Sequence, residues 1–402
     1  MLPPWLPQFL TSVAVILVVL HLCLGAAAYL ILLERRVASW VQDRIGPNRV
    51  GPLGLLQPLA DGLKLFVKEE FMPRGVDRFL FILAPAITVI PALIGFVVIP
   101  WGGYLVLGNG ETVSIMGADI NIGVVYLIAT GSLGVYGVGL GGWASNNKFS
   151  FLGGLRASAQ MISYEIPMGL ALLCVILTAG TLLPQEIVAR QLESQWFIVQ
   201  QPLAAIVFFI CLLAEANRAP FDLAEAEQEL VGGWHTEYSS MKWALFFMGE
   251  YVHLVVGAAF FTTLFLGGWS INPITGWDLP QTGGIFLILL QFGIVLGKCF
   301  LLIFFGMMIR WTIPRFRFDQ LMKLAWEGMI PISLGLLLMT SVFVYFGWTQ
   351  WLWAGSLGAT IILIAIQPML PSRSIVNRKI GLVGSRFSPV EDEAASGIPA
   401  KN

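Results

Sequence analysis

Long uncharged stretches alternate with short charged ones along most of this chain of 402 residues. The uncharged stretches are residues 1–33, 79–110, 120–147, 166–185, 194–214, 251–277, 279–309 and 328–372, of which 279–309 is interrupted only by Lys298. A helix needs about 20 apolar residues to cross a bilayer, so the last stretch has room for two helices, divided near residues 347–350. The pattern therefore predicts an all-α, polytopic transmembrane bundle of about nine helices.

A different periodicity occurs between residues 55 and 68, where apolar and polar side chains fall on opposite faces of a helix. The apolar face holds Leu55, Leu56, Leu59, Leu63, Phe66 and Val67, and the polar face holds Gln57, Asp61, Lys64 and Lys68. This pattern predicts an amphipathic helix lying in the plane of the membrane interface. Such a helix is either a simple surface anchor or the frame of an entrance for a lipid-like substrate.

Composition agrees with a membrane protein, because 57% of the residues are apolar and only 12% are charged, against about a quarter in ordinary proteins. We expect one transmembrane domain at 1–370, with a cytoplasmic linker at 34–78 and an acidic cytoplasmic loop at 215–243. A polar cytoplasmic tail is expected at 371–402. The net charge of −1 gives no reason to expect a nucleic-acid partner.

Basic residues predict the orientation, because Lys and Arg concentrate on the cytoplasmic side of membrane proteins. With nine spans, 21 of the 23 basic residues fall on one side. Only Arg190 lies on the other side, and Lys298 is internal. The N-terminus is therefore expected outside and the C-terminus in the cytoplasm.

The four cysteines are isolated from one another in apolar stretches and form no CxxC pattern. Iron–sulfur clusters and zinc sites need thiolates or imidazoles at ligand spacing. No metal site is therefore predicted, and any electrons that concern this protein must be carried by another molecule.

Carboxylates gather between residues 215 and 250, in a chain that otherwise avoids charge. They are Glu215, Asp222, Glu225, Glu227, Glu229, Glu237 and Glu250. Charged groups at membrane depth are costly and usually functional. Glu225 and Glu229 would share a helix face, and neighbouring carboxylates in a poorly solvated site cannot all ionise. Either these residues form protonatable sites or the segment is a solvated acidic loop; the apolar residues interleaved with the acids favour the first interpretation.

Three further features could carry chemistry. Arg218 and Asp222 are spaced i,i+4 across Pro220 and would form an opposite-charge pair. Glu165 precedes Pro167 near the expected start of a span, so it is either an internal protonatable site or a helix-end carboxylate. Basic and aromatic residues alternate at 310–320, a pattern that fits phospholipid headgroups or a docked soluble protein.

Ordered motifs occur at residues 34–36, 44–52, 54–69, 163–167, 214–227, 235–239, 247–251 and 314–320. Together they resemble the NuoH-type membrane subunit family of respiratory complex I, the proton-pumping NADH–quinone oxidoreductase. The resemblance covers roughly residues 8 to 345. Residues 346–402 extend beyond the shortest family members and receive little functional support from it.

The resemblance implies a protein that completes a quinone cavity with soluble neighbours and couples quinone reduction to proton translocation. The residues that match the cavity and its entrance are Glu34, Arg35, Arg36, Arg44, Asp61 and Phe221. Those that match the coupling path are Glu165, Glu215, Arg218, Asp222, Glu225, Glu227, Glu229, Glu237 and Glu250.

The same resemblance implies that quinone is the substrate and that this chain binds no cofactor covalently. NADH, FMN and the iron–sulfur clusters would belong to partner subunits. The implied partners are the soluble quinone-site and iron–sulfur subunits, the small membrane subunits and the antiporter-like subunits, with phospholipid around them. The implied location is the bacterial inner membrane.

Two alternatives remain. A freestanding proton-coupled transporter would be expected to show an internal repeat, and none is visible in the sequence. A scaffold protein of a ferredoxin- or hydrogenase-linked complex would keep the same architecture without a quinone.

Overall fold

The computed structural model describes residues 5–108, 110–224, 227–274 and 278–366, without the side chains of residues 227, 228, 363 and 364. The α-helices are α1 (Leu6–Val41), α2 (Gln57–Val67), α3 (Arg78–Gly95), α4 (Gly123–Ala144), α5 (Lys148–Ala179), α6 (Pro184–Glu193), α7 (Phe197–Gln200), α8 (Pro202–Glu215), α9 (Glu227–Leu230), α10 (Ser240–Phe265), α11 (Ile285–Thr312), α12 (Phe318–Lys323), α13 (Ile330–Tyr345) and α14 (Leu352–Ile366). Short 3-10 helices lie at Pro52–Gly54, Phe96–Val98, Gly233–His235 and Thr349–Trp351, and Leu324–Met329 forms a π-helix between α12 and α13.

Seven helical segments of the described chain are long and apolar enough to cross a membrane. They are α1, α3 with the 3-10 helix after it, α4, α5, α10, α11 and the continuous segment from α12 to α13. The prediction of an all-α polytopic bundle is confirmed. The other two predicted spans correspond to α8, with 14 residues, and α14, with 15.

α8 is short because Pro202 begins it and the preceding residue, Gln201, is not helical. At 1.5 Å per residue, its 14 residues extend over about 21 Å, less than the hydrocarbon thickness of about 30 Å. The four-residue α7 precedes the break. This span is therefore a broken helix, in which backbone groups at the break need polar partners.

The chain divides into two compact units, residues 1–357 and 358–402. Of the second unit, the structure describes residues 358–366, which form the last part of α14. The expected polar tail, 371–402, lies outside the described residues, so the proposed division at residue 370 stays a prediction.

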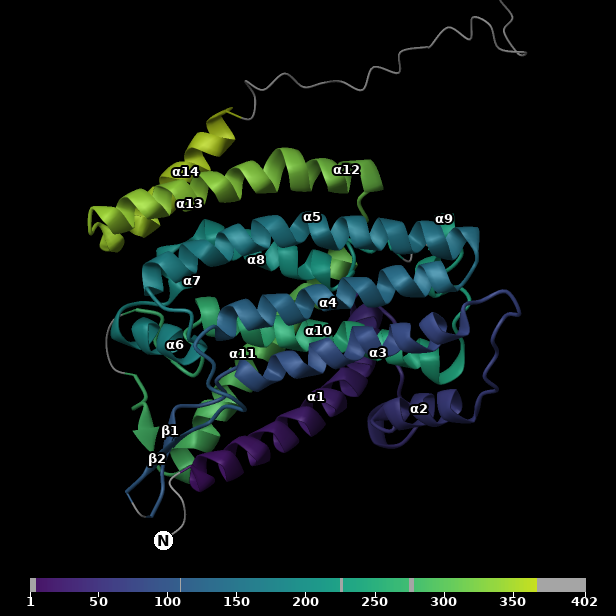
Figure 1. Cartoon of the computed structure of the whole chain (residues 1–402), viewed down its shortest axis with the longest axis horizontal. Coiled ribbons are helices and arrows are strands. Elements are labelled where there is room, and N and C mark those ends of the chain that lie inside the picture. Colours follow the sequence, from purple (N-terminus) through teal and green to yellow (C-terminus); the bar gives the residue numbers. More distant parts are fainter. Residues whose placement is uncertain (1–4, 109, 225–226, 275–277, 367–402) are drawn as a thin grey trace, which may run out of the picture. The chain divides into compact units, whose positions relative to one another are not determined.

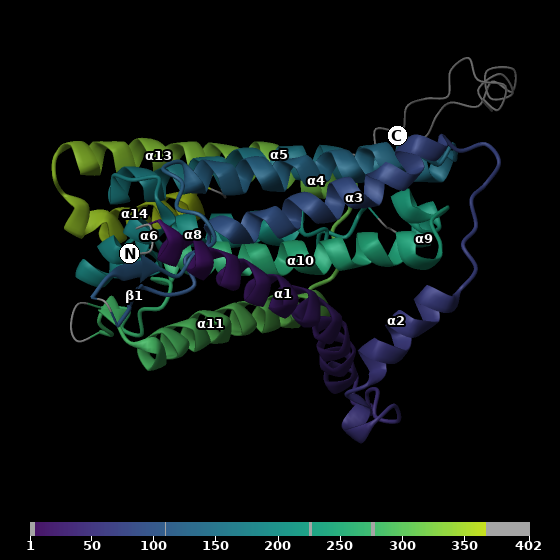
Figure 2. The same cartoon turned by 60° about the horizontal axis from the view of Figure 1, so that its bottom comes forward.

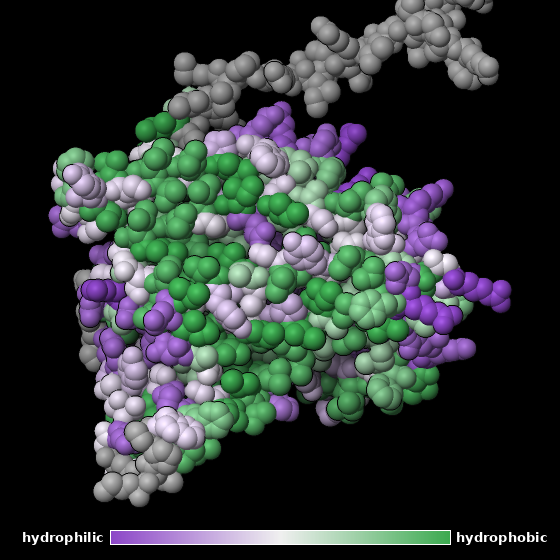
Figure 3. All heavy atoms as spheres, in the orientation of Figure 1, coloured by the Kyte–Doolittle hydropathy of each residue, from purple (hydrophilic) through white to green (hydrophobic). Residues whose placement is uncertain are grey.

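Within the first unit, α4 packs between α3 and α5, while α10 contacts α1, α3 and α11. α5 also contacts α8 and α13. α2 lies beside the C-terminal part of α1 (Figures 1 and 2) and contacts α10 as well. On the face in Figure 3, hydrophobic residues cover the middle of the helices and hydrophilic residues gather at both ends, as a membrane-spanning bundle requires.

Three helices extend past the uncharged stretches that predicted them. α1 continues to Val41, α5 begins at Lys148 and α10 begins at Ser240. Glu34, Glu165 and Glu250 therefore lie inside helices, well away from the helix starts. The interpretation of Glu165 as a carboxylate at the start of its helix is wrong, because α5 begins 17 residues before it.

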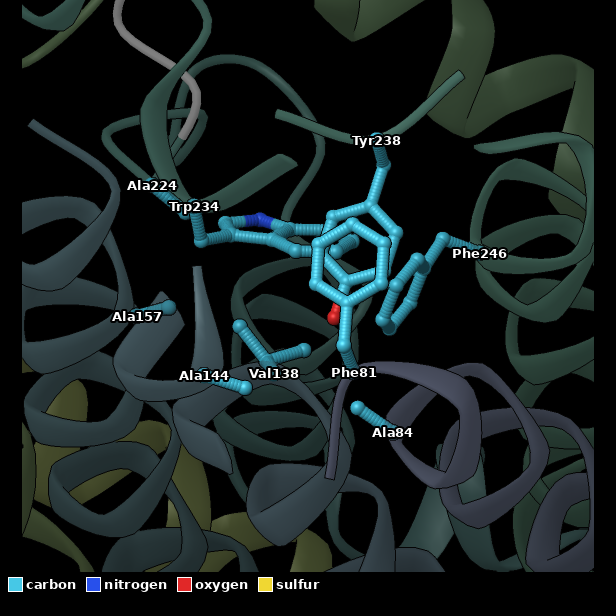
Figure 4. Close-up of a cluster of buried hydrophobic side chains, with 9 residues drawn as sticks. All are labelled: Phe81, Ala84, Val138, Ala144, Ala157, Ala224, Trp234, Tyr238 and Phe246. Atoms are coloured by element: carbon cyan, nitrogen blue, oxygen red, sulfur yellow. The ribbon is translucent and has the colours of Figure 1, made fainter. Parts of the chain in front are cut away.

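An aromatic cluster holds the segment between α8 and α10 against the bundle (Figure 4). The Phe81 ring stacks on Tyr238 at 4.0 Å, and Trp234 meets Phe246 edge-on at 4.4 Å. Gly153 of α5 permits this approach, because a Cβ there would lie 2.5 Å from the backbone nitrogen of Trp234. The described part of the segment is thus packed into protein, and the alternative of a solvated loop is wrong for it.

A three-stranded sheet lies at the end of the bundle away from this cluster, where the sequence had indicated only helices (Figure 1). Strand β1 (Tyr104–Val106) pairs antiparallel with β2 (Thr112–Ser114) and parallel with β3 (Thr282–Gly283). Gln291 of α11 accepts a hydrogen bond from Gly103 N at 2.8 Å and donates one to Pro280 O at 2.8 Å. These bonds tie the sheet to α11.

Candidate functional site

A buried cation lies between four elements of the bundle. Arg218, in the non-helical segment after α8, is 7% exposed. Its Nη1 lies 3.3 Å from Oε2 of Glu34 on α1, and its Nη2 lies 3.3 Å from Oε2 of Glu250 on α10. The guanidinium also covers the Tyr251 ring at 4.0 Å. Because burying a charge without partners is very costly, these contacts hold Arg218 and both carboxylates in place together.

Glu34 receives more than the arginine. The Tyr251 hydroxyl donates to Glu34 Oε2 at 2.6 Å, and Arg310 of α11 forms an ion pair with the same carboxylate. α1, α10, α11 and the segment after α8 therefore meet at one carboxylate. We call Glu34, Arg218, Glu250, Tyr251 and Arg310 the Arg218 cluster.

The partners of Arg218 and Asp222 differ from the pair expected from the sequence. Asp222 forms its ion pair with Arg315, at 2.8 Å, while Arg218 faces Glu34 and Glu250. The i,i+4 rule applies only within a helix, and the described residues between α8 and α9 are not helical. The expected Arg218–Asp222 pair is thus replaced by two contacts to other segments.

Phe221 is buried and lies away from the expected cavity. Its ring centroid is 5.5 Å from that of Tyr164 and 5.6 Å from that of Phe316. Phe316 N also donates to Pro220 O at 3.2 Å. Phe221 and Asp222 therefore fasten the segment that follows α11 beside the Arg218 cluster.

The intramembrane acids lie on α5 and α8, both facing α4. Glu165 accepts a hydrogen bond from Ser132 Oγ of α4. Glu215, the last residue of α8, lines two small cavities together with His253 of α10. The structure thus brings Glu165, Glu215 and Glu250 to the inside of one group of helices.

The remaining acids of the expected path lie nearer the surface. Glu229 pairs with Arg156 at 2.7 Å, and Glu237 accepts from Asn147 Nδ2 at 2.5 Å. Glu225 and the side chain of Glu227 lie outside the described residues. The prediction that Glu225 and Glu229 share a helix face therefore stays a prediction.

A cavity of about 200 Å³ opens between α1, α2 and α10. Its lining is mostly apolar and includes Leu24, Ala28, Ile31, Leu65, Phe247 and Met248. The polar groups at its rim are Arg35 and Asp61, which form an ion pair at 2.7 Å, and Gln57, which donates to Asp61 at 2.9 Å. The cavity therefore combines an apolar channel with a few polar groups, as sites for amphipathic ligands do.

The amphipathic helix faces this cavity with its polar side. Gln57 and Asp61 line the cavity, whereas Leu59, Leu63 and Phe66 are 71%, 64% and 73% exposed. An exposed apolar stripe on an amphipathic helix suits contact with lipid. α2 thus separates an apolar outer face from a polar rim.

Two residues expected at the entrance have other roles. Arg36 donates to Leu53 O, and Arg44 donates to Gln42 at 2.8 Å. Both stabilise the turn between α1 and α2. Of the six residues expected at the cavity, the structure places Arg35 and Asp61 on its lining, and Glu34 in the Arg218 cluster.

Phe247 connects the cavity to the Arg218 cluster. It lines the cavity, and the Arg218 guanidinium lies 5.6 Å from its ring centroid. The sequence had not indicated Phe247, Tyr251 or Arg310 as site residues. The signal for the first two was their position beside Glu250 on one helix, and Arg310 had served only to orient the chain.

A second buried cation lies on α11. Lys298 Nζ donates to three backbone carbonyls, of Leu266 at 2.5 Å, Gly268 at 2.8 Å and Ser270 at 2.5 Å. It also lies 4.1 Å from the Trp196 ring centroid. Lys298, which the sequence had left without a role, therefore fixes the loop that follows the C-terminal end of α10. All three ammonium protons have acceptors.

The described residues contain no group of three or more His, Cys, Asp or Glu side chains placed to hold a metal ion. The four cysteines are buried and unpaired with one another. What the site offers is instead charge: two guanidinium groups and several carboxylates in a low-dielectric interior, where a change of charge on one group strongly affects the others.

The fold and the site together define a polytopic helical membrane protein that carries a network of charged side chains inside its bundle. The chain belongs to the NADH dehydrogenase family, whose model matches residues 13–341. The family expected from the motifs is therefore confirmed.

Named relatives in several bacteria are similar to this chain along most of their length. A Cytophaga hutchinsonii protein, named as a first H subunit of NADH-quinone oxidoreductase, is 49% identical over 325 residues, which cover 81% of this chain and 94% of that protein. The H subunit of the same enzyme in Protochlamydia amoebophila is 51% identical, covering 79% and 93%. A first H subunit in Geobacter sulfurreducens is 48% identical, covering 84% and 95%.

Proposed function

We propose that this chain is the NuoH-type membrane subunit of a proton-pumping NADH–quinone oxidoreductase. In this role it forms part of the quinone cavity and couples quinone reduction to proton translocation. The printed names of the relatives support the complex, and they favour it over a freestanding transporter or a scaffold in a hydrogenase-linked complex. The observation that carries the coupling role is the Arg218 cluster, which touches the cavity through Phe247 and the membrane interior through Glu250.

The cavity suits the apolar part of a quinone. Its volume of about 200 Å³ is below the roughly 300–1,000 Å³ of complete ligand sites. We infer that it holds part of the isoprenoid tail and that soluble partner subunits complete the head-group site. Arg35 and Asp61 would then lie where the quinone enters from the bilayer, with the exposed apolar face of α2 against the lipid.

Coupling would proceed through charge. A quinone takes up two electrons and two protons on reduction to quinol, and the electrons come from partner subunits that carry NADH, FMN and iron–sulfur clusters. Removing or adding charge beside Phe247 changes the electrostatic potential at Arg218 and at the carboxylates of Glu34 and Glu250. Each tenfold change in proton affinity is about 1.4 kcal/mol, so a few coupled carboxylates transmit several kcal/mol.

The path would continue through Glu215 and Glu165 toward the antiporter-like subunits. Glu225, Glu227, Glu229 and Glu237 would connect it to the surface between α8 and α10. We further propose that the N-terminus lies outside and the C-terminus in the cytoplasm of a bacterial inner membrane, because this orientation puts nearly all basic residues inside.

The experiment replaces Glu165, Glu215, Glu227 and Glu250 one at a time with glutamine in the assembled complex. Quinone reductase activity and proton pumping are measured in inner-membrane vesicles, and electron transfer from NADH to a hydrophilic acceptor that bypasses quinone reports assembly. We expect reduced pumping with the acceptor activity preserved. Glu193→Gln is the matched control, because Glu193 is 67% exposed at the opposite end of the bundle. Full reductase activity and full pumping in all four variants would remove the acidic path.

The entrance needs a separate test. A photoreactive quinone should label residues between Glu34 and Lys68, and added natural quinone should reduce that labelling. Labelling confined to a soluble partner protein would leave this chain a scaffold role only. A freestanding transporter would instead give substrate-dependent flux when expressed alone.

A further inference from the structure

Two small cavities lie inside the bundle among α3, α4, α8 and α10. Their volumes are about 40 Å³ and about 20 Å³, and Glu215 and His253 line both. Glu250 lines the smaller one. A polar cavity needs roughly 10–15 Å³ of such volume to hold a water molecule. Both cavities therefore have room for water, roughly three molecules in the larger and one in the smaller.

His253 is directed toward this space. Within the described part of the chain its Nε2 is buried and has no hydrogen-bond partner. The nearest side of α4 carries glycine: a Cβ on Gly134 would lie 2.9 Å from Nε2 of His253. A buried ring nitrogen without a partner is costly, so a water molecule in the adjoining cavity is the partner that the geometry favours.

Glu215 faces the same side of α4. A Cβ on Gly131 would lie 3.0 Å from Oε1 of Glu215. Residues three apart on a helix have Cβ positions about 5–6 Å from each other. The carboxylate of Glu215 and the imidazole of His253 therefore approach neighbouring points of α4, at a separation that one or two water molecules can bridge.

Glu250 lies on the other side of the imidazole. It precedes His253 by three residues on α10, so both side chains project from the same face of that helix. Both line the smaller cavity with Glu215. The order in space is then Glu250, His253 and Glu215, and Glu250 is in contact with Arg218.

We propose that His253 passes protons between Glu250 and Glu215 through water in these two cavities. The proposal rests on the proposed coupling function and adds a residue to its path. The ring accepts one proton, carries one positive charge, and releases that proton to the next group. The donor carboxyl becomes a carboxylate and the acceptor carboxylate becomes a carboxyl, so protons and charge balance. Imidazole suits this step because it binds and releases protons near neutral pH.

The test uses His253→Ala in the assembled complex, with chemical rescue. General acid–base groups contribute about 10²–10⁴-fold to proton-transfer rates, so we expect pumping and coupled quinone reduction to fall about tenfold or more. Electron transfer from NADH to a hydrophilic acceptor should not change. Added imidazole should restore part of the pumping. Pyrazole, which has the same size and is hardly basic, should not restore it.

A packing role for His253 predicts different results. Equal rescue by imidazole and pyrazole, or wild-type pumping in His253→Ala, would overturn the proposal. If His253→Ala does not assemble, His253→Gln decides by the same measurements, because its amide fills similar space and cannot relay a proton. Wild-type pumping in that variant would equally reject the relay.

Glu215→Gln separates this proposal from the coupling function on which it rests. Loss of pumping in Glu215→Gln with wild-type pumping in the His253 variants rejects the relay and leaves the acidic path in place. Wild-type pumping in all of these variants rejects both. Gly134→Ala supplies an independent check, since the added methyl group displaces the imidazole and should reduce pumping without removing a titratable group.

Discussion

Arg218 and Lys298 are both cations held inside the bundle, and both lie about 4 Å from an aromatic ring, Tyr251 and Trp196 respectively. They differ in their anionic partners. Arg218 faces the carboxylates of Glu34 and Glu250, whereas Lys298 donates to three backbone carbonyls. The ring contact is therefore common to both sites, and the acceptor is what separates them.

The difference in acceptors is a difference in what each site can do. A carboxylate can take up a proton and lose its charge, but a peptide carbonyl cannot do so near neutral pH. The surroundings of Arg218 can therefore change with proton uptake, while those of Lys298 stay constant. A site of the first kind suits energy coupling, and one of the second kind suits fixing a loop. Each variant below tests this contrast.

The largest effect is expected for Arg218→Met. The substitution leaves two carboxylates buried beside each other without their cation, and breaking a buried ion pair costs about 3–5 kcal/mol. We expect little assembled complex, with no pumping in what remains. Arg218→Lys keeps the charge and loses the planar fork, so it should assemble better and still pump poorly. Native gels and vesicle pumping measure both, and normal pumping in Arg218→Met would refute the role of the cluster.

Lys298→Met should lower stability and leave coupling intact. Hydrogen bonds to a charged group contribute about 1.5–3 kcal/mol each, and partial access of water to the freed carbonyls reduces the total to about 3 kcal/mol. Thermal unfolding of the purified complex measures this loss. Pumping per assembled complex should stay close to wild type. A specific loss of pumping at normal stability would show that the two cations are not different in kind.

Tyr251→Phe removes one hydroxyl from the Arg218 cluster. That hydroxyl donates to Glu34 at 2.6 Å, so its loss should cost about 1.5 kcal/mol of stability. Pumping should fall more than the artificial-acceptor activity, because the charge on Glu34 is less well held. Phe343→Leu, which alters an aromatic contact on α13 far from the cluster in sequence, is the control for general packing effects.

Asp61→Asn tests the rim of the larger cavity. The Arg35–Asp61 pair is 47% and 30% exposed, and such pairs contribute at most about 1 kcal/mol to stability. We therefore expect normal assembly and a raised KM for quinone with little change in kcat. Steady-state kinetics with a series of quinone tail lengths measure this. A changed kcat at constant KM would place Asp61 in the coupling path instead.

The smallest effect is expected for Arg190→Gln. Arg190 and Glu193 are 64% and 67% exposed and 3.9 Å apart, so this pair contributes close to nothing. Stability, assembly and pumping should all match the wild type. Any clear loss would indicate that Arg190 contacts a partner protein in the complex.

The helices were predictable because uncharged stretches of membrane-spanning length report local hydrophobicity directly. Their ends were not, because charged residues such as Glu34 and Lys148 continue a helix when the bundle supplies partners. The amphipathic helix was predictable from its periodicity. The cavity behind its polar face was not, since that cavity depends on how α1 and α10 approach α2.

The acids at 215–250 were identifiable as a functional segment because charge at membrane depth is costly wherever it occurs. Their partners could not be read from spacing. Arg218 lies 184 residues from Glu34 along the chain, and Asp222 lies 93 residues from Arg315. His253 and Lys298 likewise gain their roles from glycines and carbonyls on other helices.

Hydrophobic length and charge cost act on each segment separately, so the sequence alone determines that this chain is a helical membrane protein with an acidic centre. Which charges neutralise one another depends on distances between segments, and electrostatic energy falls with those distances and with the local dielectric. Only the packed bundle therefore distinguishes Arg218, held by groups that titrate, from Lys298, held by groups that do not.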